Sequence, residues 1–352
     1  MIHDQVRLHN VAQLVPVPGQ DGLRLQRVPE HVRLCLNEKS QEKMLMPVGA
    51  EIRFRSDGDK VAVTLRCPVG SCEVIPFWGP FQGPRTNVAA GTKTLELEYP
   101  ARLRDLPEQA SSRMAFSPRV WRLVLRGAPV HFVGIEGQGI RPPEPSELPD
   151  LRMIAYGTSI TQGSAATANH LTYVHQAARL LGADIRNLGS SGSAYCEPEI
   201  ADYIASCDDW DAGVLCVSVN MVGAGFTLEE YAERTSYMIR TLADSNGKRE
   251  LFCITPFPHY RDFNPAFSGD GTVAKGTLEQ FRQTLRDVVS TLGRSNVHIL
   301  EGPELLTRVE GLSIDMIHPS DPGMAEIGYR LAARISAKLS IPMEGYADEH
   351  RA

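Results

Sequence analysis

The 352-residue sequence predicts an all-β domain followed by an α/β domain. Three observations predict this fold class. Apolar residues alternate with polar ones over much of the first 140 residues, short apolar runs alternate with helical stretches after residue 150, and a proline-rich segment separates the two patterns. A chain of this length commonly forms two domains, and its hydrophobic content of 42% supplies a core for each.

Alternation with a period of two in the first 140 residues is typical of half-buried strands. Residues 52–54 and 61–65 alternate in this way on either side of a Ser-Asp-Gly-Asp turn at 56–59, which predicts a hairpin. Glycine and proline punctuate the region, and it shows little helical periodicity. We therefore expect a β-sandwich or jelly roll, in which two later runs, 95–99 and 121–125, also form strands.

Residues 141–150 contain four prolines, a composition that favours an extended linker over a packed element. We place the domain boundary there. The expected organisation is a β domain over residues 1–140, a linker over 141–150, an α/β domain over 151–342 and a short tail over 343–352.

The α/β domain is predicted from five short apolar runs separated by helical stretches, an order that implies a parallel sheet covered on both faces. A capping box, Thr-Leu-Glu-Glu at 227–230, predicts the start of one helix. Its apolar face includes Tyr231, Met238, Ile239 and Leu242. The predicted strands are 153–156, 184–188, 213–219, 251–255 and 297–300.

Charge and composition restrict the class of partner. The net charge of −6 and the absence of long Lys/Arg runs argue against nucleic acid or an anionic membrane surface as the main partner, so we expect a small-molecule substrate. No apolar run reaches the ~18 residues that a membrane span needs, and the N-terminus lacks a signal-peptide pattern. These features predict a cytoplasmic protein, or a secreted one if a signal peptide has been removed.

The seven cysteines match no zinc pattern and are expected to be reduced thiols. A Cys67–Cys72 disulfide in an oxidising compartment is the alternative. The ten histidines are dispersed and there is no His-Glu-x-x-His motif, so we expect neither a metal nor another cofactor.

A serine follows the first predicted strand of the α/β domain in a position suited to a nucleophile. The apolar run that begins at residue 151 stops at Gly157, and Ser159 comes two residues later. A serine hydroxyl reacts only when a neighbouring base takes its proton. His318 is the candidate base, and Asp315 lies three residues before it, close enough to fold back and orient the imidazole.

Two further polar positions follow predicted strands, where ligands gather in parallel sheets. Gly192 lies in the Gly-Ser-Ser-Gly segment after the second strand, and Asn220 follows the third. Taken singly, each of these residues has an ordinary structural explanation as a helix cap, a turn glycine or a loop residue. Acyl transfer explains them jointly, since the N–H groups of Ser159 and Gly192 and the amide of Asn220 could bind an oxyanion.

The four segments resemble the conserved blocks of the SGNH or GDSL hydrolases. They are Gly157-Thr-Ser-Ile-Thr-Gln-Gly163, Asn187-Leu-Gly-Ser-Ser-Gly192, Ser218-Val-Asn220 and Asp315-Met-Ile-His318. The resemblance covers roughly residues 150–340 and implies a flavodoxin-like three-layer α/β/α fold, ester hydrolysis or acyl transfer, and catalytic roles for Ser159, Gly192, Asn220 and His318.

The sequence departs from the family pattern at two positions. Thr158 stands where the family name has Asp, and Met221 follows the Asn where many members have Asp. The variant block and the preceding β domain resemble a branch with an N-terminal jelly roll, which includes carbohydrate acetylesterases and acyltransferases of natural-product biosynthesis. The usual α/β-hydrolase is disfavoured, because Thr161 occupies the last glycine position of its Gly-x-Ser-x-Gly elbow.

Three functions remain open at this point. The first is a serine esterase that removes a small acyl group, such as acetyl, from a hydroxylated substrate such as a carbohydrate. The second is an acyltransferase that moves the acyl group to an alcohol. The third is a non-catalytic glycan-binding protein, suggested by the aromatic segment 77–81 that includes Trp78, although core packing of those rings is favoured. His259, Tyr260 and Trp78 are candidate substrate contacts.

Overall fold

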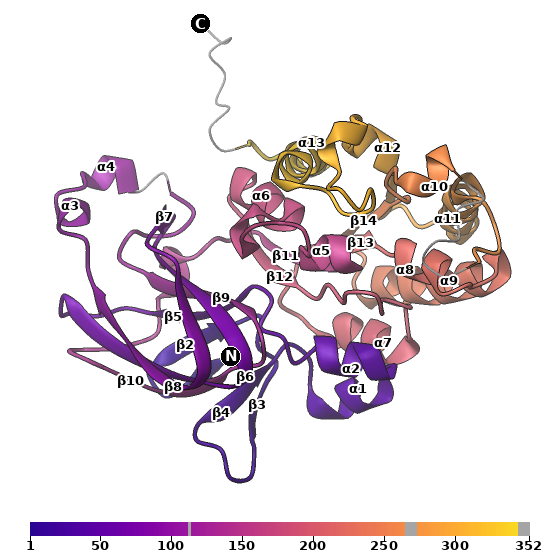
Figure 1. The fold of residues 1–352 in the computed structure, drawn as a ribbon. Coiled ribbons are helices and arrows are strands. Elements are labelled where there is room, and N and C mark those ends of the chain that lie inside the picture. Colours follow the sequence, from indigo (N-terminus) through magenta and orange to yellow (C-terminus); the bar gives the residue numbers. More distant parts are fainter. Residues whose placement is uncertain (112–113, 265–272, 344–352) are drawn as a thin grey trace, which may run out of the picture. The chain divides into compact units, whose positions relative to one another are not determined.

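The computed structural model describes residues 1–111, 114–264 and 273–343 (Figure 1). The chain divides into two compact units. The first unit contains Met1–His31 and Met44–Asp150, and the second contains Val32–Lys43 together with the residues from Leu151 onward. The 12 residues from Val32 to Lys43 thus belong with the second unit, although their position in the sequence suggested the first.

The first unit is a ten-stranded antiparallel sheet, as the alternating pattern predicts. Its main strand order is β1-β2-β5-β9-β6-β10-β4-β3, and β7 and β8 also pair with β6. The strands are β1 (Ile2–His3), β2 (Val6–His9), β3 (Gln13–Pro16), β4 (Leu23–Gln26), β5 (Ala50–Phe54), β6 (Lys60–Trp78), β7 (Phe81–Gln82), β8 (Thr86–Glu98), β9 (Trp121–Gly127) and β10 (His131–Gly137). Short helices α3 (Ala101–Arg104) and α4 (Glu108–Ser111) lie between β8 and β9.

The long strand β6 changes partners along its length. Its first half pairs with β10 and its second half with β9, and its register with β8 shifts between Cys67 and Ser71. A strand that switches partners at an irregularity makes a corner of a β-sandwich. The inward side chains of these strands form one apolar core that includes Phe54, Leu65 and Trp121.

The predicted hairpin between residues 52–54 and 61–65 is wrong, because β5 pairs with β2 and β9 and not with β6. The turn between β5 and β6 is instead tied to the end of β10. The N–H of Asp57 donates to Gln138 O at 2.9 Å, and Arg55 and Arg141 form an antiparallel bridge. Alternation correctly indicated the strands, but partner choice depended on these distant contacts.

The second unit contains a five-stranded parallel sheet with the order β12-β11-β13-β14-β15, which is the flavodoxin-like order. All five predicted strands are present as β11 (Arg152–Gly157), β12 (Asp184–Asn187), β13 (Ala212–Cys216), β14 (Glu250–Ile254) and β15 (Val297–Leu300). Strand β13 ends three residues earlier than predicted, because Val219 begins helix α8 (Val219–Gly223).

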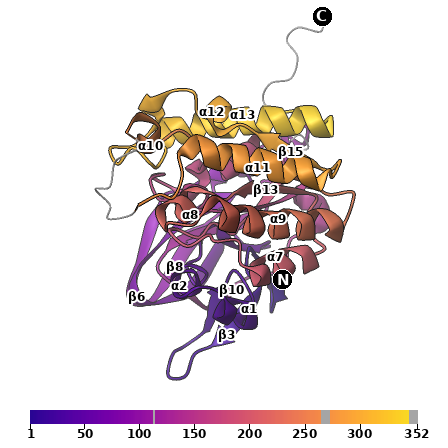
Figure 2. The same ribbon diagram turned by 90° about the vertical axis from the view of Figure 1, so that its right-hand side faces the viewer.

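Helices cover both faces of this sheet (Figures 1 and 2), which confirms the three-layer prediction. Helices α6 (Tyr173–Leu180) and α13 (Asp321–Leu339) share one core with alternate residues of β11, β13 and β14. Helices α7 (Pro198–Ser206), α9 (Leu228–Ser245) and α11 (Leu278–Leu292) lie on the other face. The remaining helices are α1 (Glu30–Cys35), α2 (Glu38–Lys43), α5 (Ser159–Gln162), α10 (Tyr260–Phe263) and α12 (Gly302–Leu305).

Local sequence signals account for the start of α9. Thr227 is its N-cap and accepts a hydrogen bond from the N–H of Glu230 at 3.1 Å, and the Glu230 carboxylate accepts from the N–H of Thr227 at 2.7 Å. The predicted apolar face of this helix is fully buried. The capping box therefore begins the helix where predicted, and burial of its apolar face holds it on the sheet.

Two further predictions concern the linker and the cysteines. Residues 141–150 cluster with the first unit and include a short 3₁₀ turn at Pro145–Glu147. Cys67 and Cys72 are thiols and form no disulfide with each other. Within the described ranges, no helix has the length and apolar content needed to cross a membrane.

Candidate active site

The turn after β11 places Ser159 at the start of a short helix. Thr158 is the N-cap of α5, and its hydroxyl accepts a hydrogen bond from the N–H of Ile160. Gly157 allows this turn to lie close against the sheet, since a Cβ there would be 2.6 Å from the carbonyl oxygen of Cys216. Ser159 is 5% exposed, and its backbone N–H occupies the first turn of the helix, where no intrahelical acceptor is available.

His318 and Asp315 complete a hydrogen-bonded chain with Ser159. The Oγ of Ser159 is 2.6 Å from Nε2 of His318, and Nδ1 of His318 is 2.7 Å from Oδ2 of Asp315. Met316, between them, has a φ of 53°, and this left-handed residue turns the chain back so that the carboxylate meets its own loop. The arrangement allows the imidazole to accept the serine proton while the carboxylate orients the ring.

The Asp315 carboxylate is stabilised in its ionised form. Partial burial by itself would raise its pKa, but hydrogen bonds from the N–H and imidazole of His318, the N–H of Ile317 and the hydroxyl of Ser313 outweigh it. Together they lower the pKa of Asp315 to about 2. The carboxylate therefore remains a hydrogen-bond acceptor for His318 across the neutral and mildly acidic range.

The orientation of Asn220 is set by its acceptor oxygen. Oδ1 accepts hydrogen bonds from the N–H groups of Ser193 and Ala194, at 3.1 and 3.2 Å. The side-chain NH₂ is consequently left as the group available to a ligand. Asn220 follows β13, as predicted, and lies in the first turn of α8, and its oxygen anchors this turn to the loop that carries Gly192.

Gly192 has a φ of 68°, a left-handed conformation that favours glycine. Its loop is tied to the turn that carries Ser159 by two side chains that were not predicted to have a role. Gln162 accepts a hydrogen bond from the N–H of Ser191 at 2.7 Å, and the amide of Asn187 donates to the carbonyl of Thr161 at 2.7 Å. Both lie inside the quoted sequence blocks, but their partners become apparent only in the fold.

A cavity of about 200 Å³ opens beside the hydrogen-bonded chain. Its wall brings together most of the predicted site residues, including His259 and Tyr260 from the loop after β14. Trp78 lies elsewhere, in the core of the first unit, where it is 6% exposed and packs edge-on against Trp121. The described residues that line the cavity are Ser159, Ser191, Gly192, Val219, Asn220, Val222, Gly223, His259, Tyr260, Arg261, Ile317 and His318.

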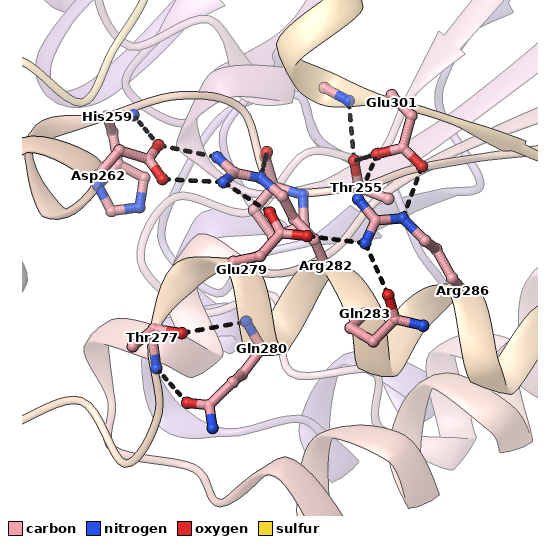
Figure 3. A network of polar contacts seen from close by, with 12 residues as sticks. Thr255, His259, Asp262, Thr277, Glu279, Gln280, Arg282, Gln283, Arg286 and Glu301 are labelled. Carbon is pink, nitrogen blue, oxygen red and sulfur yellow. Dashed lines mark hydrogen bonds and ion pairs between the residues drawn. The ribbon is translucent and has the colours of Figure 1, made fainter.

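An ion-pair network holds the wall that carries His259 (Figure 3). The carboxylate of Asp262 accepts from the N–H of His259 and receives two hydrogen bonds from Arg282, both at 2.8 Å. Arg282 also donates to the carbonyl of Pro256 at 2.9 Å, so α11 and the loop are linked at two points. Nearby, Arg286 pairs with Glu301, which accepts from Thr255 at the start of the loop. Bidentate pairs of this kind fix the relative orientation of the two side chains and also strengthen the interaction between them.

The fold and this geometry define a class of α/β proteins in which a serine, a histidine and an aspartate meet at the carboxyl end of a parallel sheet. Residues 150–335 match the model of the GDSL-like Lipase/Acylhydrolase family. The chain belongs to this family and is an enzyme that acts on ester bonds. No protein sequence among the curated proteins is significantly similar to it.

Solved structures similar to this chain share its two-part architecture. A salicylyl-acyltransferase from a tetracycline biosynthetic pathway matches with a TM-score of 0.73 and 17% identity, over 96% of this chain and 95% of that one. A GDSL-like lipase assigned in Bacteroides ovatus matches with a TM-score of 0.69 and 17% identity, over 97% and 98%. A family two carbohydrate esterase from Clostridium thermocellum matches with a TM-score of 0.57 and 19% identity, over 84% and 96%. At these identities the likeness establishes the fold alone.

In the ranges that the structure describes, no three His, Cys, Asp or Glu side chains are placed to hold a metal ion together.

Proposed function

We propose that the protein is a serine esterase that removes a short acyl group, acetyl in the first instance, from a hydroxylated substrate such as a carbohydrate. The observation that carries this proposal is the continuous hydrogen-bonded chain from Ser159 through His318 to Asp315 at the mouth of the cavity. The small volume of about 200 Å³ supports a short acyl group, because pockets for larger ligands usually measure about 300–1,000 Å³.

In the proposed reaction, Nε2 of His318 takes the proton of Ser159 as Oγ attacks the ester carbonyl. The N–H groups of Ser159 and Gly192 and the NH₂ of Asn220 stabilise the oxyanion. His318 then protonates the departing alcohol, which leaves the acyl group on Ser159. Water, activated by the same imidazole, attacks this acyl-enzyme and releases the carboxylic acid.

A carbohydrate substrate is supported by the similarity to the Clostridium thermocellum carbohydrate esterase, which was solved in complex with cellohexaose. Acyl transfer is the second candidate. It is supported by the similarity to the salicylyl-acyltransferase over nearly the whole of both chains. The two reactions use the same site and differ in whether water or an alcohol attacks the acyl-enzyme.

A glycan-binding role for the aromatic segment 77–81 has less support. Phe77 and Trp78 are 8% and 6% exposed, so their faces are covered by protein, and only Phe81 reaches 36% exposure. Stacking on a sugar requires an exposed ring face.

Hydrolysis of p-nitrophenyl esters from acetyl to octanoyl, compared between the protein and Ser159→Ala, tests the proposal. We expect acetyl turnover to be the fastest and to fall at least ~10³-fold in the variant, because removal of the nucleophile eliminates the covalent route. Mass spectrometry should detect an acyl adduct on Ser159. Activity that Ser159→Ala leaves unchanged would refute the assigned nucleophile.

Added alcohols distinguish the two candidate reactions. If the enzyme is an esterase, the acyl group appears as free acid at a rate independent of the alcohol. An acyl product formed on the alcohol, in proportion to its concentration, would favour the transferase instead.

A further inference from the structure

The segment Val32–Lys43 carries a lysine to the loop that contains Gly192. It belongs to the second unit and comprises the C-terminal part of α1, the connecting loop and α2. A Cβ built on Gly192 would lie 2.3 Å from Nζ of Lys39 and 2.8 Å from its Cε. The end of the lysine side chain therefore occupies the space that any other residue at 192 would fill.

Two residues of the same segment fix its position. The amide of Asn37 donates to the carbonyl of Ser193 at 2.9 Å and to the carboxylate of Glu197. Ser40 is 1% exposed, and its hydroxyl is 3.1 Å from that of Ser190. Residues on both sides of Lys39 are thus bonded to the loop 190–193 and to the residue that precedes α7. The backbone of Lys39 is held in place, and its exposed side chain reaches Gly192.

The ammonium group of Lys39 forms no ion pair with any residue that the structure describes. One oxygen of the Glu197 carboxylate, Oε1, accepts from both the backbone N–H and the amide of Asn37, and the other oxygen, Oε2, is buried. An exposed lysine with no acidic partner keeps its charge available to a ligand. The end of its side chain lies beside Gly192, which lines the cavity, although Lys39 is not itself one of the lining residues.

The acidic side chains next to the cavity are engaged away from it. Its described lining includes the guanidinium of Arg261 and two imidazoles but no aspartate or glutamate. Asp262, next to Arg261 in sequence, directs its carboxylate to Arg282 (Figure 3). Asp315 is turned toward His318 and its own loop. Because the described lining carries no carboxylate, it does not repel negative charge on a substrate.

We propose that Lys39 is a specificity-determining residue that binds a carboxylate on the substrate, outside the reacting ester group. This inference rests on the proposed function and narrows it to acidic esters, such as acylated hydroxy acids or acidic sugars. The carboxylate is on either the alcohol or the acyl part of the ester, and the experiment below distinguishes these two sources.

Matched pairs of charged and neutral esters test this inference. On the alcohol side, 4-acetoxybenzoate is compared with 4-acetoxybenzamide, and on the acyl side mono-4-nitrophenyl succinate is compared with 4-nitrophenyl butyrate. We expect Lys39→Met to lower kcat/KM for the charged member of one pair by about three- to fivefold, as for an exposed ion pair, and to leave both neutral esters unchanged. The pair that responds identifies the side.

Three comparisons separate charge from structure. Lys39→Arg should restore the preference for the charged ester, and Lys39→Glu should reduce it further than Lys39→Met. Added salt should diminish the preference of the unaltered protein but not that of Lys39→Met. Lys43→Met, which removes a cation from the same helix, is the control and should behave like the unaltered protein. Equal losses on charged and neutral esters, or an unchanged ratio in every Lys39 variant, would overturn the inference.

Failure of the proposed function can be recognised separately. If none of the four esters is turned over in a Ser159-dependent manner, the esterase proposal fails. The proposed carboxylate-binding role of Lys39 is then tested by NMR titration of Ser159→Ala with 4-hydroxybenzoate and 4-hydroxybenzamide. The inference is supported if 4-hydroxybenzoate binds more tightly than 4-hydroxybenzamide and Lys39→Met weakens the binding of 4-hydroxybenzoate. Equal or undetectable binding of both compounds contradicts the inference.

Discussion

The side chain of Asn220 holds a loop through its oxygen and has a proposed role as an oxyanion donor through its NH₂, and mutation can separate the two. Its oxygen anchors the N–H groups of Ser193 and Ala194, while its NH₂ is available to the cavity. Replacement by aspartate keeps the acceptor and removes the donor, whereas replacement by alanine removes both. The pair therefore distinguishes a role in catalysis from a role in holding the loop.

We expect both Asn220→Asp and Asn220→Ala to lower kcat by about 10²–10³-fold, because each lacks one oxyanion donor. Only the alanine variant leaves two N–H groups without their acceptor, so its thermal unfolding midpoint should fall further. Ester hydrolysis and calorimetry measure the two effects. Full activity of the aspartate variant would show that this amide does not stabilise the transition state.

Asp315 should contribute to stability in a pH-dependent manner. Since its pKa in the folded protein is about 2, below the ordinary value of about 3.9, folding favours its ionised form. This contribution is fully present above pH ~4 and is lost as the pH falls toward 2. We expect Asp315→Asn to have a lower unfolding midpoint than the unaltered protein at pH 6, and the difference to shrink below pH 4. A difference that is constant from pH 6 to pH 2.5 would contradict the assigned ionisation.

At the level of elements, the loop 311–320, which carries His318, is closed by contacts at its base. Leu312 and Pro319 form an antiparallel bridge, and the N–H of Ser313 donates to the carbonyl of His318 at 2.7 Å. Helix α13 begins directly after this loop, and Gly323 in its first turn lies against the backbone of Gly311. The loop that carries His318 is therefore positioned by a backbone contact that needs two glycines.

Gly323→Ala should disturb this contact, because the new Cβ would lie 2.1 Å from the carbonyl oxygen of Gly311. We expect a stability loss of about 1–3 kcal/mol from overpacking, although alanine is the better helix former, together with reduced kcat. Denaturant unfolding and ester hydrolysis measure both. Gly247→Ala, where a Cβ meets no atom within 4 Å, is the control. If the two variants behave alike, the contact does not position the loop.

The strands and helices also show how much of the fold could be predicted from the sequence. All five parallel strands and the capped helix α9 follow from local patterns, because period and capping residues are properties of neighbouring positions. The prediction of a hairpin between β5 and β6 was wrong because strand pairing, unlike period and capping, is not a property of neighbouring positions. Alternation identifies a strand, whereas its partner is selected by contacts such as Asp57 with Gln138, 81 positions away.

At the scale of the whole molecule, residues 32–43 precede most of the first unit in sequence but belong to the second unit, and this has a measurable consequence. A chain truncated to residues 145–352 lacks the segment that bonds to Ser190, Ser193 and Glu197. It leaves the Glu197 carboxylate, 8% exposed, without its amide partner. We expect the truncated protein to unfold at a lower temperature and to hydrolyse esters more slowly than the full chain, because the Gly192 loop loses its support.

Asn37→Ala in the full-length protein is the matched variant for this prediction, since it removes the side-chain bonds to Ser193 and Glu197 without removing the first unit. It should lower the unfolding midpoint in the same direction as truncation. Circular dichroism and ester hydrolysis provide the measurements. If the truncated protein has the stability and kcat/KM of the full chain, the segment plays no part in supporting the site.

The sequence by itself determined the β and α/β character of the two regions and singled out Ser159, His318, Asp315, Gly192 and Asn220. It could do so because strand periodicity, strand-end positions and the three-residue spacing of Asp315 and His318 are local. Only the tertiary structure decided which side of Asn220 meets the cavity, that Trp78 lies in a core, and that Lys39 reaches Gly192. These features arise from packing between residues far apart in the chain, and local patterns carry no record of which distant residue will be the neighbour.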